Sequence, residues 1–300
     1  MATEVLPVSV AIPTIGRLGP LRQCLQSLAA CRPCADEILV VDQSHDPAVA
    51  ELVAEFASAR ARLVRCAGKG PASGRNTGLR EARHVVVAMT DDDCTVSADW
   101  VATAWQLMGS DPEKIVTGRV LPAGDPRAVP STNEDTTPRD FTGTPRTGAL
   151  FSNNMVLNRS LALAEGGFDE RFGPEIGAED NDLCYRWLKA GRRLYFDPAL
   201  VVWHHDWRTP AELERLYVQY MRGEGFLYAK HLHQGDLRML RYIGRDLVWS
   251  LRGLAAGLMK RRPRWTDPRR AILRGMPAGL WQGWRVFWRE PRRDAERPAP

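Results

Sequence analysis

The strongest constraint on the fold is a repeated alternation of continuous β-rich runs with helical patterns. Residues 37–41 and 84–89 form such runs, and a shorter run at residues 8–12 stops at Pro13. Continuous apolar runs are typical of strands buried on both faces of a parallel sheet, because helices then cover both sides. The alternation therefore predicts an α/β fold with a mostly parallel sheet flanked by helices.

Amphipathic spacing locates the helices between these strands. Leu21, Leu25 and Leu28 recur at helical intervals, and a similar pattern covers residues 49–56. Further helices are expected at 75–83 and at 183–190, the latter with Gly191 as its C-cap, and a third should begin after an N-cap at Ser97. Further strands are expected at 63–64, 149–157, 194–196 and 200–203. Residues 122–147, rich in Pro, Thr, Gly and Asp, predict a long surface loop.

Charge is distributed unevenly along the chain. Residues 201–300 carry 20 Lys and Arg against 10 Asp and Glu, whereas residues 1–200 carry 21 against 26. From residue 210 onward the sequence is also rich in Arg and Trp, and its pattern is helical. We therefore expect one domain over residues 1–209, followed by a basic helical extension over residues 210–300.

Acidic residues stand where the predicted strands end. Asp42 follows one run and Asp91–Asp93 follow another, while Glu179 and Asp180 precede a helix and His204 follows a late strand. Ligands of open α/β sheets bind beyond the carboxyl ends of the strands. These side chains are therefore expected to converge on one site.

The triplet Asp91–Asp93 allows two interpretations. In an extended segment residues i and i+2 point the same way, so Asp91 and Asp93 could share a cation, and Mg²⁺ or Mn²⁺ suits oxygen ligands. A cation would also relieve the repulsion between crowded carboxylates. The alternative is an exposed acidic turn that caps the following helix. The position directly after a buried strand favours the metal site.

The other candidates have structural alternatives as well. Asp42 could form an Asx turn with its neighbours, and Asp180 could be a helix N-cap instead of a general base. Arg75 and Asn76 open a helix after a Gly-rich loop, a place that attracts phosphate. Because that loop matches neither the P-loop nor the dinucleotide-binding pattern, both of those interpretations are rejected.

Six short motifs resemble, in their order and spacing, those of the family 2 glycosyltransferases, which have the GT-A fold. They are VAIPT at 10–14, LVVDQS at 39–44, GRNTG at 74–78, MTDDD at 89–93, GGFD at 166–169 and GAEDNDL at 177–183. Together they cover roughly residues 8–205. The resemblance implies an enzyme that moves a sugar, with inversion, from a nucleotide-diphosphate sugar to an acceptor hydroxyl. It makes residues 1–209 the catalytic domain, with a nucleotide-binding half at about 1–120 and an acceptor half at about 121–209.

The resemblance also implies roles for individual residues. Asp180 would be the catalytic base, and the metal ligands for Mg²⁺ or Mn²⁺ would be Asp91, Asp93 and His204, with His204 preferred to His205. The residues implied in nucleotide-sugar binding are Pro13, Thr14, Asp42, Arg75, Asn76, Asp91 and Asp92. Two motifs depart from the family pattern, at Gln43 and Gly74, and they leave the identity of the nucleotide open.

The acceptor is expected to be a saccharide or a lipid-linked saccharide. The tail interleaves leucines (Leu237, Leu240, Leu247, Leu251, Leu254, Leu258) with arginines (Arg238, Arg241, Arg245, Arg252). This pattern predicts an amphipathic helix that either packs on the catalytic domain or contacts anionic lipid. The segment WQGWRVFW at 281–288 adds aromatic residues suited to a membrane surface. No nucleic-acid-binding motif accompanies the charge, so no nucleic acid partner is expected.

Two further functions stay open on the sequence alone. One is a catalytically silent sugar-nucleotide-binding protein with a membrane-surface tail, against which the intact set of acidic residues argues. The other is a nucleotidyltransferase, which would carry a basic, Gly-rich signature that residues 8–17 lack. No stretch approaches the roughly 18 apolar residues of a membrane span, and the start lacks the basic region of a signal peptide. A cytoplasmic location, including the inner face of the membrane, is therefore expected.

Overall fold

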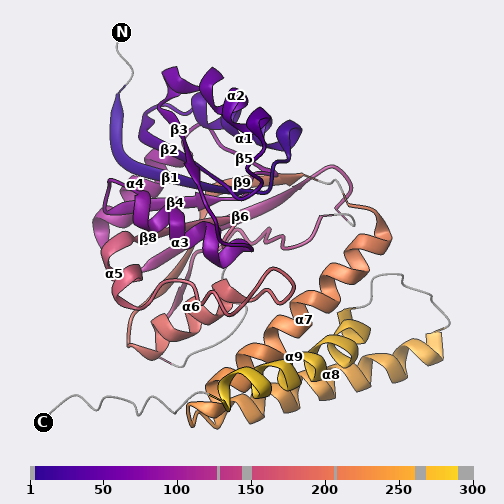
Figure 1. Ribbon diagram of the computed structural model, residues 1–300. Coiled ribbons are helices and arrows are strands. Elements are labelled where there is room, and N and C mark those ends of the chain that lie inside the picture. Colours follow the sequence, from indigo (N-terminus) through magenta and orange to yellow (C-terminus); the bar gives the residue numbers. More distant parts are fainter. Residues whose placement is uncertain (1–3, 127–128, 144–150, 206–207, 261–267, 290–300) are drawn as a thin grey trace, which may run out of the picture. The chain divides into compact units, whose positions relative to one another are not determined.

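The computed structural model describes residues 4–126, 129–143, 151–205, 208–260 and 268–289. The chain forms two compact units (Figure 1). The first comprises residues 1–171 and 179–207, and the second comprises residues 172–178 and 208–300. The domain boundary after residue 209 remains a prediction, and the second unit also includes the upstream segment 172–178.

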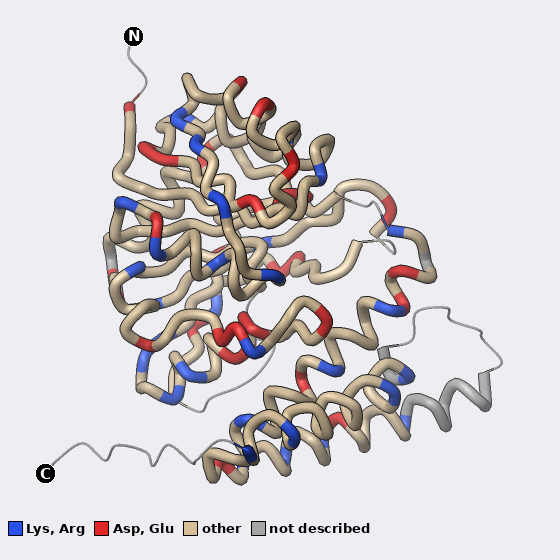
Figure 2. Tube along the Cα trace, viewed as in Figure 1, with Lys and Arg blue, Asp and Glu red and all other residues tan. Residues whose placement is uncertain are grey.

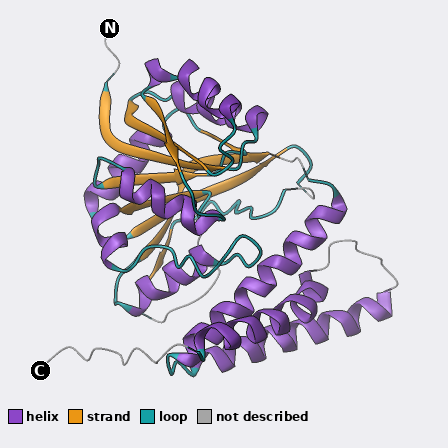
Figure 3. Ribbon diagram, in the orientation of Figure 1, coloured by secondary structure: helices purple, strands orange, loops and turns teal. Residues whose placement is uncertain are grey.

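One sheet forms the centre of the first unit (Figure 3). Its strands are β1 Val5–Thr14, β2 Cys34–Asp42, β3 Ala61–Arg65, β4 Val86–Thr90, β5 Cys94–Val96, β6 Ile115–Ala123, β7 Arg139–Phe141, β8 Asn154–Asn158 and β9 Leu194–His205. The hydrogen-bonded order is β3-β2-β1-β4-β8-β6-β9-β5, and β7 pairs with β9.

Helices cover both faces of this sheet. They are α1 Leu18–Ala29, α2 Pro47–Glu55, the 3-10 helix η1 Ala57–Ala59, α3 Pro71–Glu81, α4 Trp100–Ser110, α5 Arg159–Ala164 and α6 Glu179–Lys189. One core cluster joins α1, α2 and α4 to one face, and a second joins α3, α5 and α6 to the other. In β2, Val40 belongs to the first cluster, whereas Leu39 and Val41 belong to the second. The run at residues 38–41 is therefore apolar because both faces of β2 are buried there.

The predicted α/β class is confirmed, and the sheet is parallel in its first half and mixed beyond β4. β1 pairs in parallel with β2 and β4, and β2 pairs in parallel with β3. β8 is antiparallel to both β4 and β6, and β5 and β7 are antiparallel to β9. No helix lies between the neighbours β6 and β8 among the described residues, and parallel neighbours need such a crossover.

Several sequence-based expectations differ from the structure. Helix α3 begins at Pro71, so Arg75 and Asn76 lie in its second turn and do not open it. The strand β6 was not predicted, because Gly118 and Pro122 weaken its pattern. Gly118 is required there, since a Cβ would lie 1.8 Å from the Leu200 carbonyl oxygen. Helix α4 begins at Trp100 with Asp99 at the N-cap, so the N-cap prediction at Ser97 is wrong. The two strands predicted at 194–196 and 200–203 form the single strand β9.

The predicted long loop and the extension are both partly described. Within residues 122–147, β7 pairs with β9 and Asn133 forms a bridge with Val120, while residues 127–128 and 144–147 lie outside the described residues. The second unit contains α7 Pro210–His233, α8 Arg238–Lys260 and α9 Pro268–Phe287. Thr209 and Glu212 form a capping box at the start of α7.

Glycines bring α9 against α7. A Cβ at Gly275 would lie 2.3 Å from the Val218 carbonyl oxygen, and one at Gly279 would lie 1.9 Å from that of Arg222. The two backbones therefore pack with no side chain between them at these points. None of the described helices is long and apolar enough to cross a membrane.

Candidate active site

The carboxyl ends of β1, β2 and β4 meet at one edge of the sheet because these strands are parallel. Thr14 pairs with Asp42 in the register of β1 and β2, and Ala11 pairs with Met89 in that of β1 and β4. This register brings the residues after β4 beside the end of β1. Accordingly, the Thr14 hydroxyl donates a hydrogen bond to Asp92 Oδ2 at 2.6 Å.

Asp42 is fully buried at the end of β2. Its Oδ1 accepts hydrogen bonds from the Ser44 backbone N–H at 2.8 Å and from the Ser44 hydroxyl at 2.6 Å, and its Oδ2 pairs with Arg65. The Asx turn that the sequence allowed is therefore present. It fixes the carboxylate at the edge of the sheet where ligands of such folds bind.

The two departures from the family pattern contact each other. Gln43 Nε2 donates hydrogen bonds to the Gly68 and Gly70 carbonyl oxygens at 2.8 and 3.0 Å, which ties down the loop before α3. A Cβ at Gly74 would lie 3.0 Å from Pro13 Cβ and 3.3 Å from Gln43 Oε1. An alanine at position 74 would crowd both side chains, so Gln43 and Gly74 fit as a pair.

Asp92 is buried beneath this edge and pairs with Arg17. The Arg17 guanidinium forms one ion pair with Asp92 and another with Asp93 at 2.9 Å. Burial raises the pKa of Asp92 to about 6, although Arg17 acts in the opposite direction. Sequence reasoning did not identify Arg17. Its place just after β1, at the carboxyl edge, is the signal that could have found it.

The acidic triplet lies in a tight turn and not in an extended segment. The Cys94 backbone N–H donates to the Asp91 carbonyl oxygen at 3.1 Å. Strand alternation therefore does not apply to Asp91 and Asp93, and their carboxylates have different partners. Asp91 is 30% exposed and pairs with Arg75 at 2.9 Å, whereas Asp93 is buried beside Arg17.

A group that could hold a metal ion lies at the end of this turn. One ligand atom from each of Asp93, Cys94 and His204 lies within 4.8 Å of the others. His204 Nδ1 lies 2.9 Å from the Pro130 carbonyl oxygen, which can only accept, so Nδ1 carries the proton. The other ring nitrogen, Nε2, lies 3.5 Å from Asp93 Oδ1. This geometry suits a shared cation.

The neighbouring candidates fit a metal less well. His205 Nε2 lies 3.0 Å from the Thr95 hydroxyl, so this ring has a different partner from His204. Burial raises the pKa of the Cys94 thiol, and a protonated thiol is a poor ligand. Asp91 is not part of the metal-capable group of the described residues. Asp93 and His204 are therefore the predicted ligands that the fold brings face to face.

Arg75 connects the acidic turn to the start of α6. It is 4% exposed and pairs with Asp91 at 2.9 Å and with Glu179. Burial raises the pKa of Glu179 to about 7, with Arg75 opposing and Asp180 reinforcing the shift. Glu179 was placed at a helix start by the sequence, but its pairing with Arg75 could not be anticipated, because 104 positions separate the two residues.

Asp180 is half-buried, and its carboxylate is oriented by Ser152. Asp180 Oδ2 accepts hydrogen bonds from the Ser152 backbone N–H at 3.2 Å and from its hydroxyl at 3.0 Å. The Asn181 N–H donates to Oδ1 at 2.8 Å. Ser152 was not among the predicted site residues, and its place before β8 gave no signal.

Asn76 faces the 166–170 turn. Its Nδ2 donates to the Phe168 carbonyl oxygen at 2.7 Å and to Glu170 Oε1 at 2.9 Å, and its Oδ1 accepts from the Phe168 N–H at 2.9 Å. Gly167 has a φ of +64°, and a Cβ there would lie 2.5 Å from Asn76 Oδ1. Asn76 therefore links α3 to the turn that carries the GGFD motif.

Fold and motifs together place the chain in one protein family. Residues 9–163, more than half of the chain, match the model of Glycosyl transferase family 2. The chain belongs to this family, as the motifs predicted. Its sheet and flanking helices have the GT-A fold.

Known relatives and structures agree with this assignment. The pre-mycofactocin glycosyltransferase of Mycobacterium tuberculosis is 30% identical over 214 residues, which are 67% of this chain and 43% of that protein. The chain thus spans less than half the length of this relative. Among solved structures, the mannosyltransferase PcManGT from Pyrobaculum calidifontis, in complex with GDP-Man and Mn²⁺, matches with a TM-score of 0.62 at 18% identity. The match covers 94% of this chain and 91% of the PcManGT chain. S. aureus TarS 1–349, in complex with UDP, has a TM-score of 0.58 at 19% identity and covers 78% and 71%.

We predict that Arg75→Met destabilises the folded chain by about 3–5 kcal/mol, because it leaves the buried Glu179 unpaired. The loss should be smaller at pH 5 than at pH 8, since protonation neutralises Glu179 once its partner is gone. Urea unfolding at both pH values measures this loss of stability.

The control variant Arg22→Met removes an exposed ion pair with Glu55 and should cost below about 1 kcal/mol. Equal losses in the two variants would contradict the role of Arg75.

Proposed function

We propose that this chain moves a sugar, with inversion and with a divalent metal, from a nucleotide-diphosphate sugar to a hydroxyl of a saccharide or a lipid-linked saccharide. The observation that carries the proposal is the buried ion-pair chain from Asp91 through Arg75 to Glu179. It fixes the acidic turn, with its metal-capable pair, relative to α6, where Asp180 is the proposed base.

The donor site would lie along the carboxyl edge of β1, β2 and β4. We propose that Asp42 binds the base or ribose of the nucleotide and that the donor also contacts Pro13, Thr14, Arg75, Asn76, Asp91 and Asp92. Asp92 and Asn76 would chiefly shape the site, because Asp92 binds Thr14 and Asn76 binds the backbone of Phe168. UDP and GDP-Man occupy TarS and PcManGT, which supports a nucleotide-sugar donor at the level of the fold.

The proposed metal ligands are Asp93 and His204, with Asp91 as the third. The donor set fits Mg²⁺ or Mn²⁺, because the turn supplies carboxylate oxygens and His204 supplies a ring nitrogen. When bound, such a cation would stabilise the negative charge of the departing diphosphate. PcManGT was crystallised with Mn²⁺, which supports a divalent cation in this fold.

Asp180 would act as the general base. Ser152 holds one of its oxygens and the Asn181 N–H holds the other, so the carboxylate has a fixed orientation. Asp180 would accept the proton of the acceptor hydroxyl as that oxygen attacks C1 opposite the leaving group. A single displacement of this kind inverts the anomeric configuration.

We expect Asp180→Asn to lower turnover by at least about 100-fold while donor binding stays within threefold, because the amide keeps the shape but cannot take the proton. Steady-state transfer and calorimetric binding of the donor measure the two effects. Asp135→Asn, which alters an exposed ion pair with Arg139, should leave both unchanged. Near-normal turnover of Asp180→Asn would exclude Asp180 as the base.

Metal-dependent sugar transfer by the wild-type chain would separate this enzyme from a silent binding protein and from a nucleotidyltransferase.

His204→Ala should remove most of the thermal stabilisation that a nucleoside diphosphate gains on adding Mn²⁺. The reason is that ligand binding raises the melting temperature only while the ligand set is intact. His205→Ala is the matched control and should retain the stabilisation, since its ring faces Thr95. A normal Mn²⁺ response of His204→Ala, or its loss in His205→Ala, would refute this ligand assignment.

We also propose that the extension contacts the membrane surface at the inner face. Leu240, Val248 and Leu251 of α8 are 56%, 46% and 58% exposed. Because successive residues are turned by about 100° around the helix axis, these three side chains lie within an arc of about 80° of the helix surface. The exposed arginines 238, 241, 245 and 252 occupy the adjoining part of the same helix surface. Figure 2 shows how Lys and Arg are spread along the helices of this unit.

Helix α9 adds exposed tryptophans to the same unit. Trp281 and Trp284 are 59% and 46% exposed, and their rings stack at 5.1 Å between centroids. Exposed apolar residues beside arginines, together with tryptophans, match a helix that lies in the interface of an anionic bilayer. The side chains of Leu254 and Leu258 lie outside the described residues.

The wild-type chain should float with vesicles that contain about 30% anionic lipid and much less with zwitterionic vesicles, because about 1 kcal/mol per basic residue is gained at an anionic surface. Val248→Glu should lower the bound fraction at least about fivefold. Val85→Glu is the matched control, because Val85 is 54% exposed and lies in the first unit. Equal flotation of Val248→Glu and wild type would argue against this surface.

A further inference from the structure

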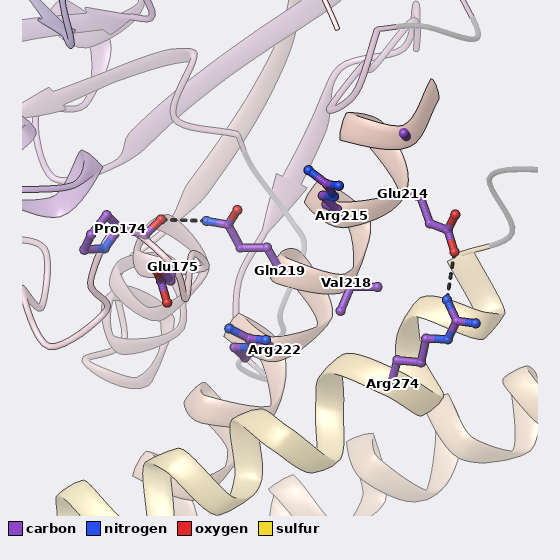
Figure 4. A pocket seen from close by; sticks show the side chains of 9 residues that line it. Pro174, Glu175, Glu214, Arg215, Val218, Gln219, Arg222 and Arg274 are labelled. Atoms are coloured by element: carbon purple, nitrogen blue, oxygen red, sulfur yellow. Dashed lines mark hydrogen bonds and ion pairs between the residues drawn. The ribbon is translucent and has the colours of Figure 1, made fainter. Parts of the chain in front are cut away.

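The second unit contains a pocket of about 760 Å³ that none of the predicted site residues lines. This volume falls within the range of about 300–1,000 Å³ that is usual for ligand sites. Its walls come from α7, from Arg274 of α9 and from the 172–178 segment, all within the same unit. Figure 4 shows these side chains around the opening. We call it the α7 pocket.

One face of α7 presents two arginines to this pocket. Arg215 and Arg222 are seven positions apart, with Val218 and Gln219 between them, so all four lie on one side of the helix. Seven residues span about 10 Å along a helix. Two guanidinium groups at this separation suit an extended anion better than a single small ion.

One buried donor atom of Arg222 has no hydrogen-bond partner among the described residues. This atom is Nε, which is shielded from solvent. Buried donors are normally satisfied, and an orphaned one calls for a missing acceptor. Arg274, by contrast, pairs with Glu214 at 2.8 Å across the wall. The wall formed by α7 therefore has an unused hydrogen-bond donor at Arg222.

The pocket has a rigid floor and a defined rim. The backbone of α9 packs directly on that of α7 at Gly275 and Gly279, next to the backbone of Val218 and Arg222. Gln219 Nε2 donates a hydrogen bond to the Pro174 carbonyl oxygen at 2.8 Å, which fastens the 172–178 segment to α7 (Figure 4). Sites held by packed helices keep their geometry better than sites on free loops.

The 172–178 segment leads without interruption into Glu179 and Asp180. Pro174 and Glu175, which line the pocket, precede the proposed base by six and five positions. A ligand in the α7 pocket would therefore contact the same stretch of chain that supplies the base. This continuity connects the pocket with the acceptor and not with the nucleotide, whose proposed site lies on β1, β2 and β4.

We propose that the α7 pocket binds a phosphate or diphosphate group of the acceptor through Arg215 and Arg222. The planar guanidinium fork matches phosphate oxygens, and Val218 with Ala211 offers apolar contact to the rest of the ligand. The inference that the occupant is the acceptor rests on the proposed glycosyl transfer. The binding of a phosphate group does not depend on turnover, so the two can fail separately.

The test uses calorimetric titration of the intact chain with inorganic phosphate, glucose 1-phosphate, geranyl diphosphate and uncharged glucose, with UDP and Mn²⁺ present to fill the donor site. At least one phosphorylated probe should bind saturably, whereas glucose should not. Preference for geranyl diphosphate indicates a lipid-linked acceptor, and preference for glucose 1-phosphate indicates a soluble sugar phosphate.

Arg222→Gln should weaken binding of the preferred probe at least about tenfold, because a charge-assisted hydrogen bond is lost. Arg222→Lys, which keeps the charge but not the fork, should fall between wild type and Arg222→Gln. Arg285→Gln removes an exposed arginine of α9 that is not in the pocket and should bind as wild type does. Circular dichroism verifies that each variant is folded. Absence of saturable phosphate binding, or equal binding by a folded Arg222→Gln variant, overturns the proposal.

Discussion

The buried guanidinium of Arg75 is the interaction on which the arrangement of the site depends. It lies on α3 and joins a carboxylate of the turn after β4 to one at the start of α6. Removing either partner would leave a charge in a place from which water is excluded, which is expensive. The two ion pairs thus hold the turn that carries Asp93 close to the start of α6, although Asp91 and Glu179 are 88 positions apart in the sequence.

The short turn at 91–94 gives three adjacent aspartates three different surroundings. Asp91 faces Arg75, Asp92 is buried against Thr14 and Arg17, and Asp93 faces His204 and Arg17. In a continuous strand the outer two would share a face. The turn separates them because β5 departs toward β9 immediately after β4. The antiparallel pairing of β5 with β9 is also what places Cys94 opposite His204.

Helical packing gives the second unit its own potential for binding. Close contact between α7 and α9 depends on glycines, and the same contact backs a pocket that contains arginines. The segment before Asp180 belongs to this unit, whereas Asp180 itself belongs to the first. The chain thereby connects the proposed chemical centre covalently to the helices. The exposed apolar and basic stripe of α8 gives this unit a second surface suited to an anionic partner.

The sequence by itself determined the α/β class, the family and the positions of Asp42, the acidic triplet, Asp180 and His204, because strand patterns and short motifs are local. It also missed β6, Arg17 and Ser152, whose importance comes from contacts made far along the chain. Only the tertiary structure decided that His204 faces Asp93 and that His205 does not, and that Asp91 pairs with Arg75. The physical reason is that side-chain direction at a turn, and the partner of a buried charge, depend on the register of strands that are distant in sequence.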